Sequence, residues 1–161
     1  MLHATIQKLN FKDQSPLLIL RAPDSFQPVI GEWKSLAKVQ TRFSAKTTYS
    51  FVLIFVQAEM DVEQLVRTVI PTLTEDAVCW VAYPKQTSKR YTSTINRDHG
   101  WSALGEAGFE PVRQVAIDED WSALRFRQAA HIRTMTRRKE MALSAAGKRK
   151  TQPASSRKPQ P

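Results

Sequence analysis

The sequence is poor in the residues that mark the best-known cofactor and metal sites. Its 161 residues include five glycines, three histidines and one cysteine. A single cysteine excludes an internal disulfide and a cysteine-based zinc site. None of the glycines falls in G-x-G-x-x-G or G-x-x-x-x-G-K-[ST] spacing, so the turns that bring backbone N–H groups to nucleotide phosphates are missing. We therefore expect no cofactor and no metal site.

Long hydrophobic runs are also absent. The longest, FVLIFV and VCWVAY, fall far short of the roughly 18 to 20 apolar residues that span a membrane. The first residues lack the basic start and apolar middle of a secretory signal. With 42% hydrophobic and 24% charged residues, the composition is typical of globular proteins. We expect a soluble, cytoplasmic protein with no membrane partner.

Charge is distributed unevenly along the chain. The net charge is +9, but residues 1–127 carry 15 Lys/Arg against 14 Asp/Glu, whereas residues 128–161 carry nine against one. If the positive charge of this protein binds a polyanionic partner, we therefore expect the C-terminal segment to be the part that binds it.

Hydrophobic patterning predicts alternating strands and helices. Two nearly continuous apolar runs, at 49–57 and 77–84, are typical of strands covered on both faces of a parallel sheet, and 17–22 and 38–44 are further strand candidates. A helix is expected after Asp61, ending at Pro71, and a second after Asn96 or Asp98, ending at Gly108.

The segment after Gly108 predicts a β-hairpin. Two strand-like runs flank Asp118, Glu119 and Asp120, and we expect Val115 and Ile117 on one arm to face Leu124 and Phe126 on the other. The fold class predicted is α/β: a single mixed, mainly parallel sheet with helices on its faces and a C-terminal antiparallel hairpin. We expect one α/β domain over 1–130, a short appended helix over 131–146 and a disordered basic tail over 147–161.

Two segments of the chain carry a resemblance. WVAYPKQTSK and AIDEDWSALRF resemble a strand and loop, W-V-x-[YW]-P-K-x-[ST]-S, and a hairpin, A-[IV]-D-[ED]-x-W-S-[AG]-L-[RK]-F, of a group of small bacterial proteins known only as a domain of unknown function. This resemblance implies no activity or cofactor. The order of elements is also similar to the C-terminal half of class I methyltransferases, an analogy of fold.

Three features that could carry chemistry have simpler explanations. Cys79 lies in an apolar strand, where a thiol is usually buried and inert. His99 and Asp98 are adjacent at an expected helix start, where capping explains an acid better than catalysis does. The acidic cluster at 118–120 is typical of a solvated hairpin turn.

The loop after the strand at 77–84 is the best candidate site. The carboxyl ends of parallel strands meet at one edge of a sheet, where ligands of α/β proteins bind. We expect a site for a small anion, a phosphate, formed by cations, hydroxyl donors and a helix start. Its candidate residues are Arg21, Tyr83, Lys85, Ser88, Lys89 and Arg90.

Three functions remain open at this point. The primary prediction is a non-catalytic binding or regulatory module with that anion site. One alternative is an enzyme of unrecognised type acting on a small phosphorylated substrate in the same crevice. The other is association with nucleic acid, weak and non-specific, through the basic tail, whose candidates are Arg137, Arg138, Lys139, Lys148, Arg149 and Lys150. No residue pattern in the sequence indicates a particular reaction, and the sequence leaves the oligomeric state open.

Overall fold

Two long apolar strands form the centre of the sheet. The computed structural model describes residues 3–132, and in it β3 (Tyr49–Phe55) and β4 (Leu73–Pro84) lie side by side and parallel. Nearly every side chain of β3 and of the second half of β4 is buried. The continuous apolar runs therefore mark strands covered on both faces, as expected.

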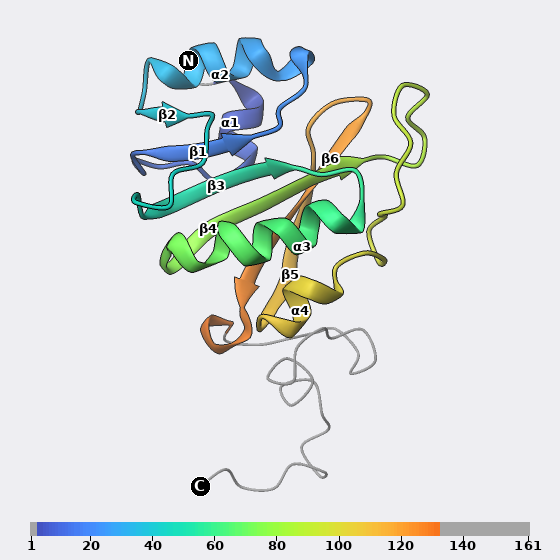
Figure 1. The fold of residues 1–161 in the computed structure, drawn as a ribbon. Coiled ribbons are helices and arrows are strands. Elements are labelled where there is room, and N and C mark those ends of the chain that lie inside the picture. The colour runs from blue at the N-terminus through green and yellow to red at the C-terminus, as the bar shows by residue number, and fades with distance from the viewer. Residues whose placement is uncertain (1–2, 133–161) are drawn as a thin grey trace, which may run out of the picture.

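The other four strands extend the sheet on both sides of this pair. The spatial order is β2-β1-β3-β4-β6-β5 (Figure 1). On one side, β1 (Leu17–Leu20) and β2 (Val39–Gln40) continue the parallel arrangement. On the other, β6 (Trp121–Gln128) runs antiparallel to both β4 and β5 (Phe109–Ala116). The predicted fold class, a mixed and mainly parallel sheet with a C-terminal hairpin, is confirmed.

Helices cover both faces of the sheet. On one face α3 (Glu59–Thr68) and α4 (Ser102–Glu106) bury Val62, Leu65 and Leu104 against one hydrophobic cluster. On the other, α1 (Ala4–Lys8) and α2 (Gln27–Lys34) belong to a second cluster that includes Trp33 and Trp80. The blue and green helices of Figure 1 show this three-layer arrangement. Single turns of 3-10 helix occur at Asp24–Phe26, Ile70–Thr72 and Ala129–His131.

Two helices were not predicted from the sequence, and one strand is shorter than predicted. Neither α1 nor α2 was expected, although Val29, Ile30 and Trp33 have the spacing of one helical face and all three are buried. The strand expected at 38–44 is reduced to two half-buried residues at the sheet edge. Short elements at the border of a fold have few contacts, so their sequence signal is weak.

The register of the hairpin differs from the prediction. Val115 lies opposite Ala123, while Leu124 lies opposite Gln114. Val115 and Ile117 pack with the α1 and α2 cluster, whereas Leu124 belongs to the cluster on the other face. The expected pairing was therefore wrong by three residues, and a shift by an odd number moves a side chain to the opposite face of a sheet.

Other expectations fall outside the described residues. The appended helix predicted over 131–146 and the tail over 147–161 lie almost entirely beyond Ile132, the last residue described. Within residues 3–132, no helix has the length and apolar character needed to cross a membrane.

The start of α3 depends on Asp61. The helix begins at Glu59, three residues earlier than predicted, and the Asp61 carboxylate accepts hydrogen bonds from the backbone N–H groups of Gln57 (2.9 Å) and Ala58 (3.1 Å). It is also paired with the Arg21 guanidinium. Burial alone would raise the pKa of Asp61, but the backbone hydrogen bonds and Arg21 together hold it below its usual value.

We expect Asp61→Ala to lower the free energy of unfolding at neutral pH by about 1 to 2 kcal/mol, because the N–H groups of Gln57 and Ala58, just before α3, lose their acceptor. The folded-state pKa of Asp61 lies below that of the unfolded chain, so its contribution is present above about pH 4 and is lost as the pH falls through the folded-state value. Urea denaturation at several pH values measures this.

The exposed acid Glu63 on the same helix provides the control. Glu63→Gln should change stability by less than about 0.5 kcal/mol at every pH. A deficit of Asp61→Ala that persists unchanged in acid would contradict this account of the helix start.

Candidate functional site

A cavity of about 530 Å³ opens at the carboxyl end of β4. Its lining combines the last residues of β4, the loop that follows, and residues of β5 and β6. The lining includes Tyr83, Lys85, Asn96, Arg97, His99 and Gln114. We call it the Tyr83 cavity. It lies at the sheet edge where ligands of α/β proteins usually bind.

The antiparallel contact between β4 and β6 positions this cavity. Tyr83 lies opposite Ser122, and the N–H of Lys85 donates to the carbonyl oxygen of Asp120 (2.7 Å). The hydroxyl of Ser88 donates to the Asp120 carboxylate (2.8 Å). The two segments that resemble the bacterial group, one in β4 and its loop and one in the hairpin, are therefore neighbours in space.

Residues 96–100 form a turn and not the predicted helix start. The backbones of Asn96 and His99 bond to each other, and the Asn96 side chain accepts from the N–H of Asp98 (2.9 Å). Gly100 follows with a φ of +104°, and α4 begins only at Ser102. A turn residue such as asparagine binds the local backbone in the same way as a helix cap, so the sequence signal is ambiguous. The turn presents His99 to the cavity.

His99 is paired with an acid from another element. Its Nε2 lies 3.0 Å from Oε1 of Glu59, the first residue of α3. Both side chains remain substantially exposed, at 66% and 46%, so a molecule in the cavity can reach them. A carboxylate that holds one ring nitrogen fixes the orientation of the imidazole and leaves the other nitrogen, Nδ1, for proton transfer.

Tyr83 forms the base of the cavity. Its hydroxyl accepts a hydrogen bond from Nε2 of Gln114 on β5 (2.9 Å) and bonds with the Ser122 side chain. Its ring packs edge-on against Trp101. Burial raises the pKa of Tyr83 and outweighs the effect of the Arg97 guanidinium, which lowers it. The phenol therefore stays protonated at neutral pH and adds a polar atom to a cavity lined mainly by polar and charged residues.

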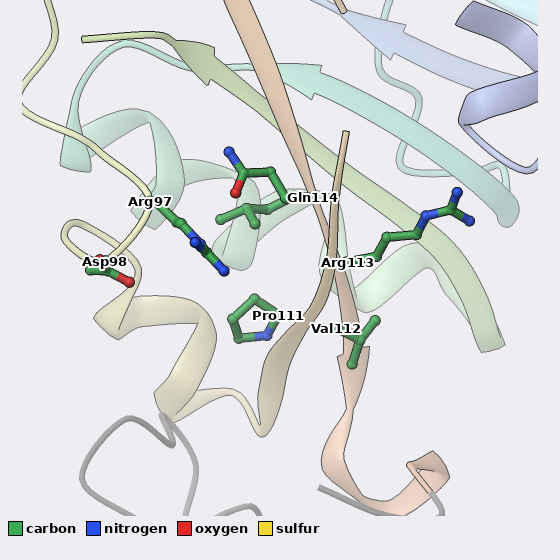
Figure 2. Close-up of a pocket in the computed structure, with 7 residues that line it drawn as sticks. Arg97, Asp98, Pro111, Val112, Arg113 and Gln114 are labelled. Atoms are coloured by element: carbon green, nitrogen blue, oxygen red, sulfur yellow. The ribbon is translucent and has the colours of Figure 1, made fainter. Parts of the chain in front are cut away.

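Arg97 connects the Tyr83 cavity with a second one. That smaller cavity, of about 190 Å³, shares Arg97, Asp98 and Gln114 with the first and extends to Pro111 on β5. Figure 2 shows the Arg97 side chain reaching from the loop toward Pro111. The Arg97 guanidinium makes no hydrogen bond or ion pair with any residue in the range 3–132. It is therefore free to bind an anion.

The six residues predicted to bind an anion lie in three places. Tyr83 and Lys85 share the Tyr83 cavity. Arg21 lies at the end of β1, where its guanidinium pairs with Asp61 and donates to Gln64 (2.9 Å). Lys89 and Arg90 line a separate open hollow.

Ser88, the sixth, is bonded to Asp120 beside that hollow. The six residues thus do not converge on one point. The six cations predicted for the tail, from Arg137 to Lys150, lie outside the described residues.

The structure agrees with the simple explanations given for Cys79 and for the acidic cluster at 118–120. Cys79 is fully buried, and burial raises its pKa to about 12, which leaves an inert thiol. The Asp118 carboxylate accepts from the N–H groups of Asp120 and Trp121, as expected of a hairpin turn. Within residues 3–132, no group of three or more histidine, cysteine or acidic residues could hold a metal ion.

Comparisons with solved structures show what this fold is similar to. PhzM, a pyocyanin biosynthetic protein, matches 78% of this chain over 54% of its own, with a TM-score of 0.52 and 11% identity. The N-methyltransferase NodS from Bradyrhizobium japonicum matches 78% over 93% of its own chain, at a TM-score of 0.49 and 12% identity. A protein of the NADB-Rossmann superfamily from Streptococcus agalactiae matches 88% over 73%, at 0.43 and 12%. No model of a known protein family and no curated protein matches this sequence.

These comparisons contradict the primary functional prediction. A non-catalytic binding module was expected, but the alternative of an enzyme agrees better with the similarity to PhzM, a biosynthetic protein that matches at a TM-score of 0.52. The looser analogy with the class I methyltransferase fold is supported. At 12% identity or less the likeness shows the fold alone, so any chemistry has to come from the side chains of this chain.

The contact between His99 and Glu59 was not predicted from the sequence. His99 was considered only with its neighbour Asp98, whereas the acid that contacts it, Glu59, is 40 positions away. Arg97 and Gln114 were not among the predicted site residues either. The sequence contained one signal for this contact, which was the position of the two residues along the chain. Glu59 and His99 each follow a strand that ends at the same edge of the sheet.

We expect Gly100→Ala to destabilise the fold and disturb the turn that carries His99. A methyl group at this position would lie 2.8 Å from Cγ1 of Ile95, and the φ of +104° is one that alanine rarely adopts. The free energy of unfolding should fall by about 1 to 3 kcal/mol, measured by urea denaturation.

Gly31→Ala is the matched control, since a methyl group there meets no atom within 4 Å and Gly31 lies inside α2. Alanine favours the helix, so this variant should be more stable by about 0.5 to 1 kcal/mol. Equal effects of the two substitutions would show that the turn is not constrained as described.

Proposed function

We propose that the protein is an enzyme that carries out acid–base chemistry on a small phosphorylated substrate bound in the Tyr83 cavity. The observation that supports this most strongly is the pairing of His99 with Glu59 at the rim of a cavity that also contains two cations, Lys85 and Arg97.

His99 is the proposed proton carrier. With Nε2 directed to Glu59, the imidazole accepts a proton from the substrate at Nδ1, and the carboxylate stabilises the imidazolium that forms. The reverse step returns the proton to the product. Proton transfer by a positioned side chain typically contributes about 10² to 10⁴ in rate.

Lys85 and Arg97 are the proposed binding groups for the phosphate. A guanidinium binds a phosphate group through two parallel hydrogen bonds, and an ammonium adds a point charge. Tyr83 and Gln114 form a hydrogen-bonded pair beneath them and would orient the rest of the substrate. Of the six residues predicted to bind an anion, Tyr83 and Lys85 line the cavity and remain in the proposed site, and Arg97 is added to them.

The ligand of the NodS structure, S-adenosylhomocysteine, does not fit the corresponding edge of this sheet. No glycine follows β1 to allow close approach of a ligand to the backbone. The Arg21 side chain instead crosses from the end of β1 to Asp61 and Gln64 of α3. After β2 come Thr41 and Arg42, where an acid would be needed to bind ribose hydroxyls. We therefore assign no step to that compound.

The resemblance to small bacterial proteins is consistent with this placement. Its two segments supply Tyr83 and Lys85 from one side and Ser122 from the other. We propose that members of that group share this cavity, and that the cavity is the reason why the two segments are alike.

Turnover of a panel of sugar phosphates and nucleotides, followed by ³¹P NMR and mass spectrometry, tests the proposed function. We expect at least one compound to be converted. His99→Gln should lower kcat at least about 100-fold with little change in KM, because it removes the proton carrier and leaves the phosphate ligands. Arg97→Met should instead raise KM about tenfold.

Glu63→Gln, an exposed change on the helix that carries Glu59, is the control and should leave both constants unchanged. A protein that converts no member of the panel would contradict the proposal. So would conversion at a rate that His99→Gln leaves unaltered.

A further inference from the structure

Three arginines gather on the opposite face of the sheet from the Tyr83 cavity. Arg125 on β6 lies opposite Trp80 of β4 on one side and opposite Arg113 of β5 on the other. Residues directly opposite each other in a sheet point to the same face, and Trp80 packs in the cluster of α1 and α2. Arg127 follows two positions after Arg125 and shares this face. We call the three side chains the arginine face.

The acids near the arginine face lie at one end of it. Asp76 accepts two hydrogen bonds from Arg127, at 3.0 and 2.7 Å, and Glu110, which is fully buried and bonded, lies in register with Arg127. Arg113 and Arg125 form no hydrogen bond or ion pair with any described residue, and Nε of Arg125 is buried without a partner. Neither of these two neighbouring guanidiniums is therefore in an ion pair with an acid among residues 3–132, although the Asp76 carboxylate acts on Arg125 from a distance and raises its pKa.

Such a pair is unfavourable on its own. Like charges directly opposite each other across two strands destabilise a sheet, and a buried donor without an acceptor is destabilising as well. Burial is the largest cause that lowers the pKa of Arg125, and Arg127 and Arg113 lower it further. The chain beyond Ile132 offers little compensation, because Glu140 is its only acidic side chain against nine Lys/Arg.

We propose that Arg113 and Arg125 bind the phosphate group of a small ligand at a second site, separate from the Tyr83 cavity. A phosphate dianion neutralises both uncompensated guanidiniums, whereas a carboxylate would neutralise one. Its oxygens would accept from the terminal N–H groups of Arg113 and Arg125, which donate to no acceptor in the described part of the chain, and Nε of Arg125 lies buried beside them. Figure 2 shows the Arg113 side chain pointing away from Arg97 and Gln114, although Arg113 also borders the smaller cavity that Arg97 lines.

NMR of the arginine side chains of the full chain tests this second site. The Nε–Hε signals of Arg113 and Arg125, assigned with Arg113→Met and Arg125→Met variants, are followed while inorganic phosphate is added at neutral pH and constant ionic strength. We expect both signals to move and to saturate together. In Arg113→Met, which replaces an exposed side chain and should fold normally, the apparent affinity read at Arg125 should fall at least tenfold.

Controls separate this site from charge screening and from the Tyr83 cavity. Arg97→Met and the distant exposed Arg67→Met should leave the titration unchanged. Chloride or acetate added in place of phosphate should produce no saturating shift. Equal shifts with chloride, or a phosphate affinity unchanged by Arg113→Met, would overturn the proposal, and a response to acetate as strong as that to phosphate would overturn the preference for a dianion.

Discussion

The arrangement of the candidate site depends on the antiparallel pairing of β4 with β6. This pairing runs from Cys79 opposite Phe126 to Pro84 opposite Trp121, and the N–H of Lys85 continues it by donating to Asp120. β6 is therefore held directly beside the end of the central strand. Because β5 pairs with β6 in turn, Gln114 reaches Tyr83. Without this contact the loop after β4 would face solvent and would have no opposite wall.

The charged residues along this edge of the sheet have different roles in its two halves. At β1 and β3, the Arg21 guanidinium is bound by Asp61, which also holds the start of α3. Charge there is balanced within the protein and serves the fold. At β4, the cations Lys85 and Arg97 border a cavity, and His99 is oriented by Glu59 at its rim. The chemistry that we propose is thus shifted two strands, from β1 to β4, away from the position that the glycine-rich turns of nucleotide-binding folds use.

Much of the fold was predictable because two long apolar runs in the sequence identify its central strands directly. The continuous apolar runs at 49–57 and 77–84 could only be covered on both faces, and Trp101, Leu104 and Gly108 took the places expected of α4 and its end. The hairpin register was not predictable, since VRQVAI and WSALRF do not alternate strictly and each has apolar residues that point to both faces. The site was half predictable. Tyr83 and Lys85 were predicted from their place at the end of a central strand. The contact of His99 with Glu59 depends on how α3 packs, and a local sequence pattern does not predict that packing.

The most direct test of the central claim is a crystal structure of the full chain soaked with tungstate, a heavy-atom analogue of phosphate that is located by its anomalous signal. We predict a peak in the Tyr83 cavity within hydrogen-bonding distance of both Lys85 and Arg97, with His99 beside it. A cavity that stays empty while tungstate binds elsewhere on the protein would contradict the assignment of this cavity as the phosphate-binding active site.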